Sequence, residues 1–437
     1  MDILIKMAQF FLCLSLLVGI HELGHFMVAR LFKMRVDKFY IFFNPWFSLF
    51  KWKRGKTEYG IGWLPLGGYV KIAGMVDESM DTEQMAAPAK PDEFRAKPAW
   101  QRLCVMVAGV VMNLIMAVAI FIGISYTWGE QYIPNSEMEW GYNFNESGEK
   151  LGFKDGDRLI SYEGEEINDV NTFFSSLLTS DGDRTITVER SGAEVDIIIP
   201  LDEIVAMREA KGYEGLLEPV LPFIVEQATS EAGQRLLKKG DQIVSLNGEE
   251  MIDFSLYADK LSSLAGTECE FGIMREGELQ SVTLPISDEG KIGVTVSNPF
   301  EYVSKKYTFI ESIPAGFNKV GEVSSAYWGQ LKAMVNPETK LYKEVGGFIA
   351  IGSVFAPEWN WLDFWAKAGL LSIMLAIMNM LPIPGLDGGH TLFTLWEIIT
   401  RRKPGEKFME IVQTIGMVLL LALALYANGS DIVKLFN

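Results

Sequence analysis

Histidine and cysteine are scarce in this chain of 437 residues, which has three of each. Cys13 and Cys104 fall in apolar runs and Cys269 in a polar region, so we expect no disulfide framework and no cysteine metal site. Positive charge is also limited, with 39 Lys and Arg against 56 Asp and Glu and a net charge of −17. This acidic balance argues against nucleic acid as a partner.

Apolar residues, in contrast, are abundant. They make up 49 % of the chain and gather in four runs, at 4–29, 103–127, 364–381 and 411–427. Runs of this length are typical of transmembrane helices. The first run has no small-x-small cleavage site, and polar residues interrupt its apolar core, so we predict a retained span and not a signal peptide.

Two of the three histidines lie inside the first run, in the sequence His21-Glu22-Leu23-Gly24-His25. On a helix, His-Glu-x-x-His places two imidazoles on one face, one turn apart, where both can bind one zinc ion. Zinc lowers the pKa of a bound water molecule, and the carboxylate of Glu22 would lie beside that water. Ionisable residues in a span are costly and usually functional, so the motif predicts a zinc site.

A zinc site needs at least a third protein ligand. The third histidine, His390, ends an unusual stretch in the third run, Asn-Met-Leu-Pro-Ile-Pro-Gly-Leu-Asp-Gly-Gly-His, which begins at Asn379. Irregular backbone at membrane depth is tolerated where it is buried in protein or lines a cavity. From the residues alone, either Asp387 or His390 can complete the site.

Together the two motifs resemble the site-2 protease family of intramembrane zinc metalloproteases, closest to the bacterial regulator-of-sigma-E protease subgroup. The resemblance implies that Asp387 is the third zinc ligand, which leaves His390 unassigned. It also implies that Glu22 is the general base and then the general acid. A helical substrate must unwind before water can attack its carbonyls, and the candidates for holding it are Asn379, Pro382, Pro384, Gly67, Gly68 and Tyr69.

Residues 57–75 alternate apolar and small side chains around Pro65 and a Gly-Gly pair, which predicts a β-hairpin. The family resemblance implies a membrane-associated hairpin near the active site. Its free edge would pair with an extended substrate.

The acidic region between the second and third runs contains an internal repeat. Gly156-Asp157 aligns with Gly240-Asp241, and Arg190 aligns with Arg275. The shared core resembles PDZ domains, so we predict two in tandem. They either bind a strand or chain end, or occlude access to the membrane site by bulk.

The second run carries Gly109 and Asn113 at helical spacing. They predict helix packing with an interhelical hydrogen bond, or direct support of the metal site. A similar Gly-x-x-x-Asn in the family favours the second possibility.

Basic residues concentrate in 30–102 and 401–407, which the positive-inside rule places in the cytoplasm. Both termini and the repeat region are then periplasmic, at a bacterial inner membrane, with the active site toward the cytoplasmic half. The predicted fold is a four-span α-helical membrane protein with a membrane-associated β-hairpin and two PDZ domains. The segments are 1–33 (first span), 34–99 (cytoplasmic, with the hairpin), 100–128 (second span), 129–215 and 216–300 (PDZ domains), 301–360 (amphipathic helix and linker), 361–392 (third span) and 393–437 (cytoplasmic loop and fourth span).

The predicted function is zinc-dependent cleavage, within the lipid bilayer, of single-span membrane proteins such as anti-sigma factors or signal-peptide remnants. An inactive scaffold that presents PDZ domains would lose a ligand or the glutamate, and all four residues are present. A metal transporter would line several spans with ligands, and the second and fourth runs have no such core.

Overall fold

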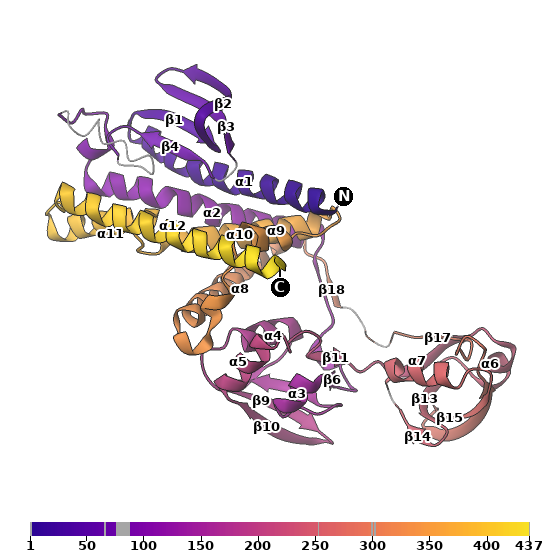
Figure 1. Cartoon of the computed structure of the whole chain (residues 1–437). Helices are drawn as coiled ribbons and strands as arrows, with labels where there is room; N and C mark the ends of the chain where they lie inside the picture. The colour runs from indigo at the N-terminus through magenta and orange to yellow at the C-terminus, as the bar shows by residue number, and fades with distance from the viewer. Residues whose placement is uncertain are drawn as a thin grey trace. The chain divides into compact units, whose positions relative to one another are not determined.

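The computed structural model describes residues 2–64, 67–75, 88–251, 253–298, 300 and 303–436. The chain divides into two compact units (Figure 1). The first comprises Met1–Gly129, Lys306–Trp328 and Lys343–Asn437, and the second comprises Glu130–Lys305 and Gly329–Tyr342. The second unit is therefore made of two segments, each inserted in the sequence between segments of the first.

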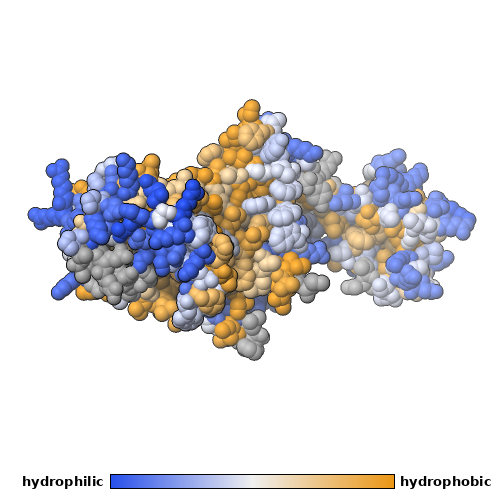
Figure 2. Space-filling model, turned by 90° about the horizontal axis from the view of Figure 1, so that it is seen from above, coloured by the Kyte–Doolittle hydropathy of each residue, from blue (hydrophilic) through white to orange (hydrophobic). Residues whose placement is uncertain are grey.

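Within the described residues, four helices of the first unit are long and apolar enough to cross a membrane, which confirms the four predicted spans. They are α1 (Asp2–Leu31), α2 (Ala99–Thr127), α10 (Trp361–Met380) and α12 (Glu406–Phe436). Many of their exposed side chains are apolar, and Figure 2 shows apolar side chains gathered over a broad surface. Such a surface is stable in contact with lipid chains.

The fourth span, α12, continues past Asn428 and Asp431 to Phe436. Asp431 Oδ2 accepts hydrogen bonds from the backbone amides of Gly347 and Ala350, at 3.0 and 2.9 Å. Asn428 Oδ1 accepts one from the amide of Phe348 at 3.1 Å. The two side chains thus cap the start of α9 (Phe348–Ser353) and leave the backbone of α12 helical.

The third span ends earlier than predicted, and a separate helix follows it. Pro382 and Pro384 have no backbone amide to donate, so α10 stops at Met380 and α11 (Asp387–Thr400) begins after a break. A Cβ on Gly388 would lie 2.1 Å from the carbonyl oxygen of Leu381, so the lack of a side chain at Gly388 allows the backbone to approach closely there. The span predicted to reach residue 392 therefore ends at Met380, and a separate helix begins at Asp387.

The predicted amphipathic helix is α8 (Phe309–Val335). Val320 and Val323, from its part in the first unit, pack against Ala117, Phe121 and Ile373 of α2 and α10. The apolar side of this part of α8 therefore covers the spanning helices.

Residues 57–75 do not form the predicted hairpin. The segment contains β3 (Thr57–Leu64) and β4 (Tyr69–Ile72), and residues 65–66 lie outside the described part. In the sheet order β2-β3-β1-β4, strand β1 (Val36–Ile41) separates them, parallel to β3 and antiparallel to β4. A Cβ on Gly60 of β3 would lie 2.3 Å from the ring of Tyr40 in β1, so this glycine makes room for the intervening strand. The remaining strand, β2 (Phe43–Arg54), forms the opposite edge.

The second unit contains two lobes with separate hydrophobic cores. The first lobe has a sheet of order β10-β9-β7-β8, and the second has one of order β16-β15-β13-β12-β17. Their strands are β7 (Arg158–Tyr162), β8 (Glu165–Glu166), β9 (Arg184–Arg190) and β10 (Ala193–Ile199), then β12 (Phe223–Ala228), β13 (Gln242–Leu246), β15 (Glu268–Arg275), β16 (Glu278–Pro285) and β17 (Val294–Val296). Strand β11 (Leu217–Pro219) pairs with β6 (Tyr142–Phe144), so the first lobe extends past the predicted boundary at 215.

The aligned residues of the repeat occupy equivalent places in the two lobes. Arg190 binds Asp157 at 2.7 Å and Arg275 binds Asp241 at 2.6 Å, and both carboxylates are buried. Each aspartate also accepts a hydrogen bond from the amide three residues before it. The Gly-Asp turn is thus fixed to the end of a distant strand in both copies.

Asp241→Asn is expected to lower the free energy of unfolding of the second lobe by about 2 kcal/mol, because it breaks a charge-assisted pair. Burial favours the neutral carboxyl, but the Arg275 guanidinium and the Lys238 amide outweigh it and hold the pKa of Asp241 below its usual range. The stabilisation is therefore complete above about pH 4 and is lost as the pH falls through the folded-state pKa. Hydrogen exchange of the full chain at pH 7 measures the change. The exposed Asp288→Asn in the same lobe is the control, and equal protection in both variants would contradict the prediction.

Candidate metal centre

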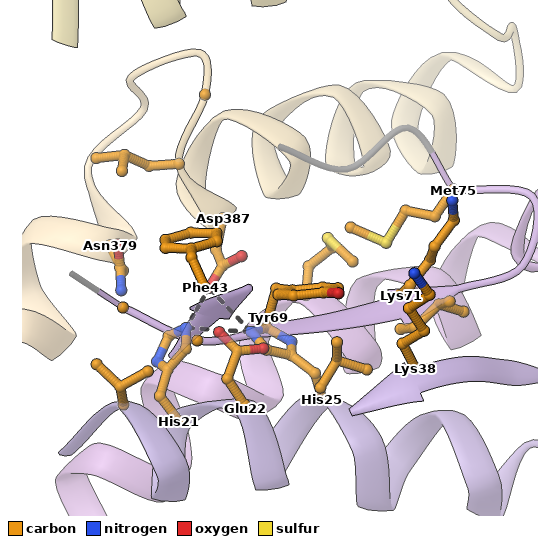
Figure 3. Close-up of a pocket in the computed structure, with 18 of the residues that line it drawn as sticks. His21, Glu22, His25, Lys38, Phe43, Tyr69, Lys71, Met75, Asn379 and Asp387 are labelled. Carbon is orange, nitrogen blue, oxygen red and sulfur yellow. Dashed lines mark hydrogen bonds and ion pairs between the residues drawn. The ribbon is translucent and has the colours of Figure 1, made fainter. Parts of the chain in front are cut away.

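The two histidines of the first span turn toward each other on a buried face of α1. The side chains of His21 and His25 lie one turn apart, and their Nε2 atoms are 3.1 Å from each other. His21, His25 and the adjacent Glu22 line one cavity (Figure 3). The helical spacing that predicted a shared metal is therefore present.

Asp387, the first residue of α11, supplies the third corner of the group. Its Oδ2 lies 3.1 Å from His21 Nε2 and 3.2 Å from His25 Nε2 (Figure 3). This oxygen is buried, and within the described residues it accepts no hydrogen bond. Three donors about 2.1 Å from a tetrahedral zinc lie about 3.4 Å apart, so the group fits that ion.

His390, the alternative third ligand, is used differently. It lines the cavity one turn further along α11, and its Nε2 lies 2.8 Å from the side-chain nitrogen of Gln413 in α12. Among the described residues, His21, His25 and Asp387 form the group that could hold a metal ion. The fold thus brings the aspartate, and not the third histidine, to the pair.

Helix α2 orients both imidazoles. The Nδ1 of His25 donates to the carbonyl oxygen of Val105 at 2.8 Å, which leaves Nε2 free for a metal. The side-chain nitrogen of Asn113 lies 3.2 Å from His21 Nδ1, and the Oδ1 of the same amide is buried without a hydrogen-bond partner among the described residues. Metal binding through His21 Nε2 puts the proton on Nδ1, so it selects the amide orientation in which Oδ1 accepts that proton. Asn113 therefore supports the site directly.

Asn113→Leu is expected to weaken zinc binding about 10- to 100-fold, because His21 loses the partner that fixes its tautomer and ring orientation. Competition with a chromophoric chelator measures the affinity. Asn113→Asp keeps an acceptor oxygen and should retain most of it. Equal affinities for the Leu and Asp variants would rule out the orienting role.

Gly109 of α2 packs against the two imidazoles, in agreement with the predicted support of the metal site by Gly109 and Asn113. A Cβ at this position would lie 2.5 Å from His25 Nε2 and 2.6 Å from His21 Cε1. On the opposing helix, a Cβ on Gly24 would lie 2.4 Å from the carbonyl oxygen of Ala108. Two glycines thus let α1 and α2 approach closely at the site. The sequence signals were the spacing of Gly109 four residues before Asn113 and the similar Gly-x-x-x-Asn of the family.

A cavity of about 680 Å³ opens beside the three donors. The described residues around it include four of the predicted substrate-binding residues, Gly67, Gly68, Tyr69 and Asn379. The Tyr69 ring stacks between Phe43 and Tyr40, with centroids 6.0 and 5.4 Å away. The Glu22 carboxylate accepts a hydrogen bond from the amide of Val70, so strand β4 borders the glutamate.

The other two predicted substrate-binding residues, Pro382 and Pro384, do not line this cavity. A Cβ on Gly416 of α12 would lie 1.9 Å from the carbonyl oxygen of Pro384, so that residue packs against the fourth span. The prolines end α10 and position α11, and their contact with substrate stays a prediction.

Known proteins with a zinc protease activity resemble this chain over nearly its whole length. Residues 9–423 match the profile of Peptidase family M50. The regulator of sigma-E protease of Escherichia coli is 28 % identical over 97 % of this chain and 98 % of its own length. The regulator of sigma-E protease of Salmonella typhimurium is 29 % identical over 98 % of this chain and 99 % of its own length. A candidate zinc metalloprotease of Vibrio cholerae is 28 % identical over 99 % of this chain and 100 % of its own length. The chain therefore belongs to peptidase family M50 and is a zinc metalloprotease.

Proposed function

We propose that this protein cleaves the transmembrane segments of single-span membrane proteins. The observation that carries the proposal is the position of His21, His25 and Asp387, which meet among helices long enough to cross a membrane. A protease site in that position favours substrates that lie in the lipid bilayer.

His21, His25 and Asp387 would hold the zinc ion, and Glu22 would carry the protons. When bound, zinc supplies a Lewis acid that lowers the pKa of water toward neutrality. Glu22 then takes a proton from the attacking water and passes it to the leaving nitrogen of the peptide. Its bond from the Val70 amide holds the carboxylate at the cavity wall while it does so.

The substrate must be extended at the scissile bond, because a helix hides its carbonyl oxygens in hydrogen bonds. Strand β4 is at the end of its sheet and lines the cavity, so it offers an edge for an extended segment. Gly67 and Gly68 allow close backbone approach, Tyr69 offers an aromatic face, and the Asn379 amide can bind an unwound backbone.

The two lobes of the second unit would act as PDZ domains that control access to the site. Each contains a small antiparallel sheet and the shared Gly-Asp turn. The lobes would bind a chain end of the substrate or block its path by their size. They would then admit a substrate only after a first cut has shortened its periplasmic part. Anti-sigma factors and signal-peptide remnants would be substrates of this regulated intramembrane proteolysis, and several relatives are named regulator of sigma E protease.

The basic segments 30–102 and 401–407 would face the cytoplasm of a bacterium. The lobes and both termini would then be periplasmic at the inner membrane, with the zinc site in the cytoplasmic half. Cysteine labelling of intact cells tests this orientation. A cysteine introduced at exposed Glu165 should react with an impermeant reagent, and one at exposed Arg402 should not. The reverse pattern would overturn it.

The activity is tested with the purified full chain in detergent and a set of single-span substrates that lack their periplasmic domains. We expect cleavage within the apolar segment, located by mass spectrometry, and its loss when a chelator removes zinc. Cleavage restricted to soluble loops would contradict the proposal. Zinc-loaded protein that cuts no substrate would favour the scaffold alternative.

A further inference from the structure

Helix α11 carries the third donor of the metal group, but with 14 residues it is too short to cross a bilayer. Its buried residues include Thr391 and Thr394, and it packs against α2. The helix has two carboxylates, Asp387 at its first residue and Glu397 near its end. Because Asp387 belongs to this short helix, the position of its carboxylate depends on how α11 is fixed to its neighbours.

An ion pair joins the second carboxylate of α11 to α2. Arg102, the only charged residue of α2, has its Nη2 2.6 Å from Glu397 Oε1, and the two side chains are 12 and 14 % exposed. The Nε of Arg102 donates to the carbonyl oxygen of Lys97 at 3.2 Å. The guanidinium also lies over the ring of Phe94, 5.9 Å from its centroid. Glu397 is therefore held by a cation that has other contacts to keep it in place.

Arg102 lies in line with the residues of α2 that support the two imidazoles. Val105, Gly109 and Asn113 follow it after three, seven and eleven residues, so all four lie along one face of the helix. The carbonyl of Val105 and the amide of Asn113 contact the imidazoles, and Gly109 packs against them. One face of α2 thus supports both histidines and, two turns before Gly109, binds α11.

We propose that the Arg102–Glu397 ion pair fixes α11 on α2 and thereby sets the place of the Asp387 carboxylate beside the imidazoles. A helix rises 1.5 Å per residue, so the pair acts through about 15 Å of α11. Separate donors bind a metal tightly when they are held together before it arrives. Neither residue is among the described residues around the cavity, so both are positioning residues. The proposal rests on the proposed function, because it takes Asp387 to be a zinc donor.

Glu397→Gln tests the proposal, because it keeps the size of the side chain and removes the charge that pairs with Arg102. We expect the zinc affinity of the full chain in detergent, measured by competition with a chromophoric chelator, to fall about tenfold, as when a metal ligand loses its outer support. The visible spectrum of the cobalt-loaded protein should also change, since it reports the geometry of the donors. Arg102→Gln should behave alike. The double variant should bind zinc no more weakly than either single variant, because both changes remove one contact.

Asp363→Asn is the matched control, since it breaks an ion pair of the same length, with Lys367 at 2.6 Å, but within α10 alone. It should leave the zinc affinity and the cobalt spectrum unchanged. Arg102→Lys keeps the charge without the planar guanidinium, so it should lose a smaller part of the affinity, and it decides the question if Glu397→Gln does not fold. The proposal is overturned if Glu397→Gln and Arg102→Lys both bind zinc like the unmutated protein, or if Asp363→Asn loses as much affinity. Full zinc affinity in Asp387→Asn would instead count against the proposed function.

Discussion

Glu22→Gln is expected to lower kcat/KM for a single-span substrate at least about a thousandfold while about one zinc ion per chain remains bound. Glutamine has nearly the shape of glutamate, and its Oε1 can still accept the hydrogen bond from the Val70 amide. The three candidate zinc donors, His21, His25 and Asp387, are unchanged. The amide cannot take a proton from water, so only the proton transfer is lost.

Cleavage kinetics and metal analysis of the same preparation measure the two quantities together. Glu165→Gln, an exposed change in the second unit, is the control and should match the unmutated enzyme. If Glu22→Gln lost zinc along with activity, Glu22 would be holding the site together and the base assignment would fail. Retained cleavage would mean that another group carries the proton.

Gly109→Ala is expected to weaken zinc binding at least about tenfold and to lower kcat/KM by a similar factor or more. The added methyl group would lie 2.5 Å from His25 Nε2 and 2.6 Å from His21 Cε1, so one or both imidazoles must move. Alanine is favoured over glycine in a helix by about 1 kcal/mol, so α2 itself should not be weakened. The damage should therefore be confined to the metal centre.

The matched control is Gly123→Ala in the same helix, because a Cβ there meets nothing within 4 Å. This variant should bind zinc and cleave substrate like the unmutated protein. Zinc affinity comes from chelator competition, and helicity from far-ultraviolet circular dichroism. A Gly109→Ala protein with unchanged zinc affinity would show that α1 and α2 can separate at no cost, which would remove the argument for Gly109.

Much of the site was predictable because its information is local. The spacing of His21, Glu22 and His25 places them on adjacent turns of any helix, and the apolar run around them is long enough to span a bilayer. The Gly-Asp repeat was visible in the same way, and both copies form the same ion pair. Two prolines that have no amide to donate indicated irregular backbone after Met380, although the predicted span continued to residue 392.

The contacts between distant segments were decided only by the tertiary structure. From the residues alone, Asp387 and His390 were equal candidates, and the start of α11 at Asp387 turns that carboxylate to the two imidazoles. The hairpin expected at 57–75 was wrong, because β1 inserts between its strands where Gly60 leaves room for Tyr40.

The sequence by itself therefore determined the chemistry of the first helix, the four spans and the repeat. Each depends on neighbours a few residues away or on the length of a run. The third donor of the metal group and the contact of Gly109 with the imidazoles depend on which remote segments approach. That approach follows from packing and strand pairing across the whole chain, which local spacing does not encode.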